Sequence, residues 1–154
     1  MTRRAVSYIE VVVAVAVLGT GMAMGLGTYG AFARGAAGTR EMAAATELAA
    51  QLAAEIRTQA FEDAVQPVFG PEPGESDGTR MNFDDVDDYH NYSASPPKLR
   101  DGTTLTDFTG YAQRVTVVSN VSTGLRVITV TITVNGRKRA EIVLARARHG
   151  ADQR

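Results

Sequence analysis

The chain has 154 residues, which is enough for one ordinary domain and a membrane segment. Its formal net charge of -1 gives no global field that would attract nucleic acid or an acidic substrate. The chain has no cysteine, which excludes a disulfide framework and a thiolate metal site.

A long apolar run near the N-terminus predicts a membrane-spanning helix. The run from Val11 to Ala33 contains no charged residue. As a helix it is about 35 Å long, and a bilayer's hydrocarbon core is about 30 Å thick. Arg3 and Arg4 precede the run, so the positive-inside rule predicts a cytoplasmic N-terminus with the rest of the chain on the other side.

Glu10 lies at the start of this run, where an acidic side chain is costly. A charge deep in a transmembrane helix costs roughly 2.5–3.5 kcal/mol, and less near the helix end. The position of Glu10 therefore predicts a partner that neutralises it. Gly21 and Gly25 form a small-xxx-small pattern, which favours close packing of this helix against another. The alternative for the glycines is a slightly flexible anchor.

The segment RRAVSYIEVVVA, residues 3–14, resembles the prepilin start of the type IV pilin superfamily. In that pattern a basic leader ends in a small residue, and a glutamate stands five residues past the cut. Ala5 replaces the usual glycine and Val6 the common phenylalanine. The resemblance implies that a membrane prepilin peptidase cuts between Ala5 and Val6 and N-methylates Val6. It also implies that Glu10 neutralises the free amine of a neighbouring subunit during assembly. The alternative is a plain signal anchor with an isolated acid.

The sequence divides into six predicted parts. A leader (1–5) and a transmembrane and assembly helix (6–33) are followed by an amphipathic helix (34–64). In this last helix, apolar residues recur every three or four positions. They are Ala45, Leu48, Leu52, Ile56 and Ala60. The pattern predicts one face packed on a sheet, with charged residues such as Glu55 largely on the opposite face.

The fourth part, 65–107, is rich in proline and glycine and contains an acidic segment, 81–92. Its aspartates could supply oxygen ligands for Ca²⁺, although their spacing is not that of the helix-loop-helix calcium motif. They are Asp84, Asp85, Asp87 and Asp88. The favoured interpretation is a solvated turn with Phe83, Val86 and Tyr89 packed inward. A metal site and an exposed partner-contact loop are the alternatives. The segment is similar to one in minor pilins of the mannose-sensitive haemagglutinin pilus type.

The sequence shows no catalytic constellation. His90 and His149 are the only histidines, and no serine lies in a nucleophile-elbow pattern. We expect His90 to be a structural hydrogen-bonding residue. We therefore expect no enzymatic activity and no cofactor.

The fifth part, 108–147, predicts an antiparallel sheet with strands at 111–118, 125–134 and 139–147. A two-residue turn at Asn135-Gly136 would place Ile132 opposite Arg139 and mix the two faces. We therefore predict a three-residue loop, 134–136, with a bulge that pairs Ile132 with Lys138 and Val130 with Ala140. The sixth part is a basic tail, 148–154. It lacks interleaved aromatic residues, so we expect no nucleic-acid binding.

Together these parts predict an α+β, pilin-like fold, in which a long N-terminal helix packs on a small C-terminal antiparallel sheet. The resemblance implies a structural subunit, either a minor pilin or a type II secretion pseudopilin. Its partners would be the prepilin peptidase, other subunits of the same kind and the inner membrane, with the C-terminal domain in the periplasm. The alternative is a single-pass, membrane-anchored periplasmic binding module that never polymerises.

Overall fold

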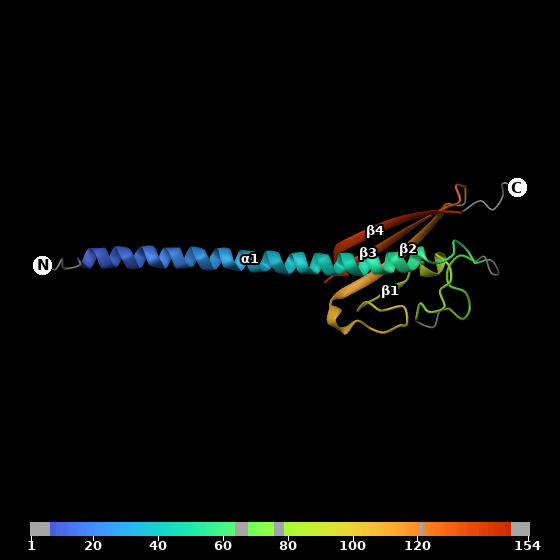
Figure 1. The fold of residues 1–154 in the computed structure, drawn as a ribbon, viewed down its shortest axis with the longest axis horizontal. Helices are drawn as coiled ribbons and strands as arrows, with labels where there is room; N and C mark the ends of the chain where they lie inside the picture. Colours follow the sequence, from blue (N-terminus) through green and yellow to red (C-terminus); the bar gives the residue numbers. More distant parts are fainter. Residues whose placement is uncertain (1–6, 64–67, 76–78, 121, 149–154) are drawn as a thin grey trace. The chain divides into compact units, whose positions relative to one another are not determined.

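The computed structural model describes residues 7–63, 68–75, 79–120 and 122–148 (Figure 1). The chain divides into two compact units, Met1–Arg40 and Glu41–Arg154. A single helix, α1 (Tyr8–Arg57), contributes to both units. The second unit also holds a four-stranded sheet and two short 3-10 helices, η1 (Asp87–Tyr89) and η2 (Thr106–Phe108).

In the first unit, α1 begins directly after Ser7, whose carbonyl accepts the N–H groups of Glu10 at 3.0 Å and Val11 at 3.3 Å. The glycines of the apolar run do not interrupt the helix. Its large apolar side chains are exposed. By length and composition the helix could cross a membrane, a test that a signal sequence near an N-terminus also passes.

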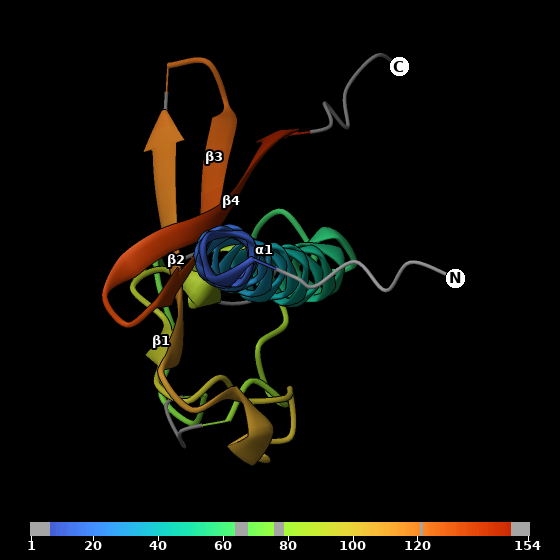
Figure 2. The same cartoon turned by 90° about the vertical axis from the view of Figure 1, so that its left-hand side faces the viewer.

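In the second unit, an antiparallel sheet has the strand order β1-β2-β3-β4. The strands are β1 (Ser93–Ala94), β2 (Tyr111–Asn120), β3 (Leu125–Val134) and β4 (Arg137–Ala147). Figure 2 looks along the helix and shows the three long strands on one side of the part of α1 that belongs to this unit. This arrangement confirms the predicted α+β fold with a long N-terminal helix.

The core lies between α1 and the sheet. The helix contributes three buried alanines and three larger residues, Leu48, Leu52 and Ile56. The sheet contributes Val115, Val117, Ile128, Val130, Ile132 and Leu144. Burying each large aliphatic side chain stabilises the fold by about 1.5–3 kcal/mol. The predicted packing of the sheet on the Leu48–Leu52–Ile56 stripe is therefore confirmed.

The helix ends at Arg57, seven residues before the predicted boundary at 64, and Ala60 is exposed rather than part of the stripe. Tertiary hydrogen bonds compete with the helical pattern here. The N–H of Ala60 donates to the carbonyl of Asp84 at 3.1 Å, and its carbonyl accepts the N–H of Val86 at 3.1 Å. This short parallel bridge draws the chain away from the helix axis.

The predicted three-residue loop between β3 and β4 is wrong. Val134 pairs with Arg137 across a two-residue turn, in which Asn135 has φ 50° and Gly136 has φ 76°. The bulge lies further along β4, because Thr133 pairs with Lys138 while Ile132 pairs with Ala140. Arg139 is the extra residue. It restores the match of apolar faces that a regular two-residue hairpin would lose.

Candidate functional site

Two regions carry the residues singled out by the sequence: the N-terminal part of α1 and the acidic segment. Ala5 and Val6 lie outside the described residues. Glu10 lies in the first turn of α1 and is exposed. Gly21 follows about three turns later, so it lies on nearly the same side of the helix as Glu10, with Gly25 one turn further on.

No contact within the described chain requires glycine at these two positions. A Cβ atom added at Gly21 or at Gly25 would meet no atom within 4 Å. Each glycine inside a helix costs about 1 kcal/mol relative to alanine. Gly21 and Gly25 therefore do not stabilise the monomer. Because they have no side chains, they form a smooth stripe that a second helix could approach closely.

The acidic segment is a buried structural element, so the predicted solvated turn is wrong for three of its four aspartates. Asp84 is exposed, whereas Asp85, Asp87 and Asp88 are each 1% exposed. The inward packing of Phe83, Val86 and Tyr89 is confirmed.

The carboxylate of Asp85 holds the surrounding backbone. Its oxygens accept the N–H groups of Asp63 at 2.7 Å, Asp87 at 2.7 Å and Asp88 at 3.3 Å. Such bonds satisfy buried N–H groups that the 3-10 helix leaves unpaired. Among the described residues, only Asp88 of the four aspartates belongs to a carboxylate group compact enough to share a cation, so the four do not form the calcium site of the alternative interpretation.

Asp87 forms a buried ion pair with Arg126 of β3. The Arg126 guanidinium also donates to the carbonyl of Phe61 and lies over the Phe61 ring, 4.5 Å from its centroid. Burial and the neighbouring Asp85 raise the pKa of Asp87 to about 7, against the opposing effects of the Gly70 N–H and Arg126. This pair joins the acidic segment to the sheet.

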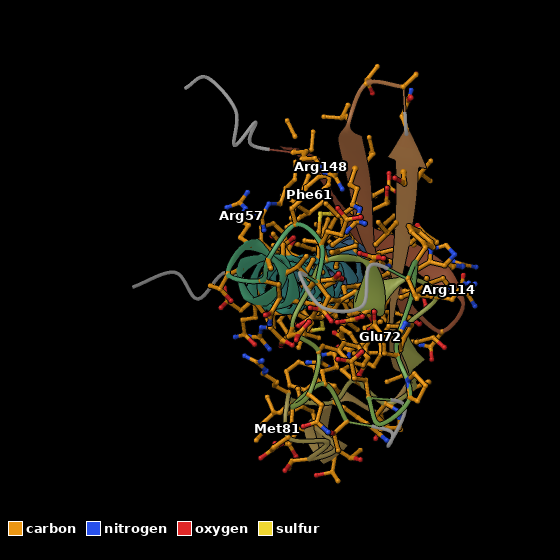
Figure 3. All side chains as sticks on the ribbon, turned by 90° about the vertical axis from the view of Figure 1, so that its right-hand side faces the viewer. Arg57, Phe61, Glu72, Met81, Arg114 and Arg148 are labelled. Atoms are coloured by element: carbon orange, nitrogen blue, oxygen red, sulfur yellow. The ribbon has the colours of Figure 1, made fainter. Side chains whose placement is uncertain are left out.

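The chain around Phe61 receives a second arginine. Arg148 forms an ion pair with Glu62, and its guanidinium lies 5.9 Å from the Phe61 ring centroid. Figure 3 shows Phe61 and Arg148 next to each other. Of the predicted basic tail, Arg148 alone belongs to the described residues.

His90 makes a structural hydrogen bond, as predicted: its Nδ1 accepts the N–H of Val117 at 3.2 Å. The ring also lies 5.1 Å from that of Phe69. His149 lies outside the described residues. The hydrogen bond between Val117 and His90 anchors the end of η1 to β2.

The sequence did not single out Glu72 and Glu75, which the structure brings next to Asp88. The fragment Pro71-Glu72-Pro73-Gly74-Glu75 reads as an ordinary turn, and nothing in its spacing points to Asp88. The one available signal was that this turn and the acidic segment are both acidic.

No family model, curated protein or solved structure matches this chain. The function of this chain is therefore argued from the residues of two regions. One is the Glu10–Gly21–Gly25 side of α1, and the other is the carboxylate cluster of Glu72, Glu75 and Asp88.

Proposed function

We propose that this protein is a structural subunit of a membrane-derived filament, either a minor type IV pilin or a type II secretion pseudopilin. One observation carries the proposal: Glu10 lies in the first turn of a long apolar helix and is the fifth residue after Ala5, within a segment that resembles a prepilin start. The sheet packed on the later part of α1 supports it, because such a domain can travel with the helix into an assembly.

The chemistry of assembly follows from the position of Glu10. Cleavage after Ala5 creates a new amine on Val6, which is positively charged at neutral pH after methylation as well. Opposite charges attract strongly in a medium of low dielectric, and each alone is penalised there. The carboxylate of one subunit and the amine of its neighbour would therefore enter the filament as a pair.

The surface of the helix supports the same proposal. Its apolar side chains are exposed in the monomer, and two glycines leave a smooth stripe on the side of Glu10. Lipid covers such a surface before assembly, and neighbouring helices cover it afterwards. The subunit would wait in the inner membrane with its N-terminus in the cytoplasm and its sheet domain in the periplasm.

Mass spectrometry of the protein purified from membranes tests the processing step. We expect a mature chain that begins with N-methylated Val6 in cells with an active prepilin peptidase, and an uncut chain in cells without the enzyme. An intact Met1, or a cut elsewhere, in the first strain would argue strongly for a plain signal anchor.

A substitution of Glu10 tests the assembly step. We expect Glu10→Ala to lower incorporation into sheared filaments at least tenfold while processing continues. Glu47→Ala is the matched control, since Glu47 is an exposed acid on the same helix outside the apolar run. Incorporation of Glu10→Ala at the wild-type level would remove the role of the carboxylate. A wild-type chain that is processed but never enters filaments would favour the alternative of a membrane-anchored binding module.

A further inference from the structure

Three carboxylates from two separate segments meet in the second unit. Glu72 and Glu75 lie in the turn after Gly70, and Asp88 lies in η1. One oxygen from each side chain lies within 4.8 Å of the other two. In Figure 3, Glu72 lies among packed side chains, whereas Met81 lies at the periphery.

Three carboxylate oxygens of the cluster, two from Glu72 and one from Asp88, are buried without a hydrogen-bond partner. Glu72 is 6% exposed, and both of its carboxylate oxygens are buried without a hydrogen bond. The Oδ1 atom of Asp88 is in the same situation. Within the described part of the chain, no lysine, arginine or histidine forms an ion pair with any of the three. Buried carboxylates without a donor or a counter-charge are strongly penalised.

The remaining oxygens hold the side chains in place. Glu75 accepts the backbone N–H of Glu72 through Oε2 at 2.9 Å. Asp88 accepts the N–H groups of Asp84 and Asp85 through Oδ2, each at 3.0 Å. Glu75 and Asp88 thus each use one oxygen to accept backbone N–H groups, whereas both oxygens of Glu72 stay available. This is the arrangement of a preorganised ligand set.

The electrostatics agree with this geometry. Burial, followed by the nearby Glu75, raises the pKa of Glu72 above its ordinary value. Burial also raises the pKa of Asp88 to about 6, and both Asp85 and Glu72 add to the rise. Three like charges in one place favour any cation that can share them.

We infer that Glu72, Glu75 and Asp88 bind a hard divalent cation, and that Ca²⁺ fits best. The ligand set is all oxygen, which selects Ca²⁺ or Mg²⁺ over softer metals. Ca²⁺ accepts six to eight oxygens in a flexible geometry and binds carboxylates through one or both oxygens, whereas Mg²⁺ demands a near-ideal octahedron and loses its waters reluctantly. Three protein carboxylates brought together from two segments therefore suit Ca²⁺ better. A cleft lined by Pro71, Glu75, Asp88 and His90 adjoins the cluster and leaves room for the waters that complete the coordination.

Calorimetric titration of the full chain in detergent, first treated with EGTA, tests this inference. We expect one saturable Ca²⁺ site with a Kd of about 10⁻⁴–10⁻³ M, the range of extracellular calcium modules. We also expect Ca²⁺ to raise the melting temperature, and Mg²⁺ to do so less at equal concentration. No saturable binding up to about 10 mM, or an equal response to Mg²⁺, would overturn the site.

Conservative variants separate a cation site from a merely acidic cluster. We expect Glu72→Gln and Glu75→Gln each to weaken Ca²⁺ binding at least tenfold. Glutamine at 75 still offers an oxygen to the Glu72 N–H, so the turn is retained. Glu72→Gln should leave the metal-free melting temperature equal or higher, because it removes a buried charge.

Asp107→Asn is the control, because Asp107 is an exposed carboxylate outside the cluster. It should bind Ca²⁺ as the wild type does. Equal Ca²⁺ responses from all four proteins would show general charge screening and overturn the assignment. The result is independent of processing and assembly, since Glu10 and the N-terminus are unchanged in every variant.

Discussion

Arg80 and Glu55 form a bidentate ion pair that joins the loop-rich region after α1 to the helix. The Nε and Nη2 atoms of Arg80 donate to Oε1 and Oε2 of Glu55 at 2.9 and 3.0 Å. Their side chains are 4% and 16% exposed. The hydroxyl of Tyr89 also donates to Glu55 Oε1 at 2.9 Å, and the Arg80 guanidinium lies over the Tyr92 ring. One helix residue therefore organises much of the polar side of the core.

Removing Arg80 should destabilise the domain strongly. We expect Arg80→Ala to lower the free energy of unfolding by about 3–5 kcal/mol, because Glu55 would keep a largely buried and uncompensated charge. Arg114→Ala is the control, since Arg114 is exposed on β2, and it should change the value by less than about 0.5 kcal/mol. Urea unfolding followed by tyrosine fluorescence measures both. Similar small losses for the two variants would contradict a stabilising role for the pair.

Deleting the bulge residue should be tolerated better than deleting its neighbour. Without Arg139, Ile132 still faces Ala140, and the hairpin becomes a regular one. The lost contact is the half-exposed ion pair with Glu41 at 3.0 Å, which is worth about 0–1 kcal/mol.

Deleting Glu141 has one of two consequences, since side chains alternate along a strand. If the bulge stays, Ile142 and Leu144 shift to the opposite face of β4. If the bulge closes, Arg139 moves opposite Ile132 on the apolar face. We expect a loss of several kcal/mol, as for other emptied core positions. Urea unfolding of the two deletion variants makes the comparison. Equal losses would show that Arg139 does not set the register.

Asp88 should make the metal-free protein less stable as pH rises. Burial raises its pKa from 3.8 to about 6 in the folded state, so the folded protein holds this proton more tightly than the unfolded chain. The contribution of Asp88 to stability is complete below about pH 4 and is lost as pH rises through about 6. The total change is about 3 kcal/mol.

Unfolding experiments in EGTA between pH 4 and pH 7 measure this effect. The free energy of unfolding of the wild type should fall relative to that of Asp88→Asn over this range. Asp107→Asn, which changes an exposed carboxylate, should run parallel to the wild type. Parallel curves for wild type and Asp88→Asn would contradict the raised pKa.

The periodicity of apolar residues predicted the helix and the long strands of this fold. It did not predict where the helix ends or the register of the hairpin between β3 and β4. The alternation from Ile128 to Val134 and the helical spacing of Leu48, Leu52 and Ile56 each report one buried face, and both were found as expected. The end of α1 depends instead on a bridge between Ala60 and the acidic segment, which is remote in sequence. The hairpin register depends on a bulge at Arg139 that local turn chemistry does not encode.

Burial of charge was the least predictable feature. A run of aspartates is typical of solvated loops, yet here backbone N–H groups and Arg126 hold three of them inside. These partners are supplied by tertiary structure. The cluster of Glu72, Glu75 and Asp88 could not be predicted for the same reason, because no fixed spacing relates the turn to η1.

The glycine stripe on α1 allows a sharp test of the proposed assembly surface. At 100° per residue, Gly21 lies about 20° from Glu10 around the helix, whereas Gly19 lies about 180° away. An added Cβ atom meets no atom from elsewhere in the described chain within 4 Å at either position, and both glycines are exposed, so neither change disturbs a contact of the monomer. Gly21→Leu and Gly19→Leu also raise helix propensity and hydropathy by the same amount.

Only the side of the helix therefore distinguishes the two variants. If helices pack along the Glu10 side, Gly21→Leu should lower incorporation into filaments by about tenfold or more, since a leucine keeps the backbones apart. Gly19→Leu should assemble as the wild type does. The fraction of processed protein in sheared filaments, relative to the membrane fraction, measures this directly. Equal incorporation of the two variants would place the packing surface elsewhere on the helix, and loss by Gly19→Leu alone would place it on the opposite side.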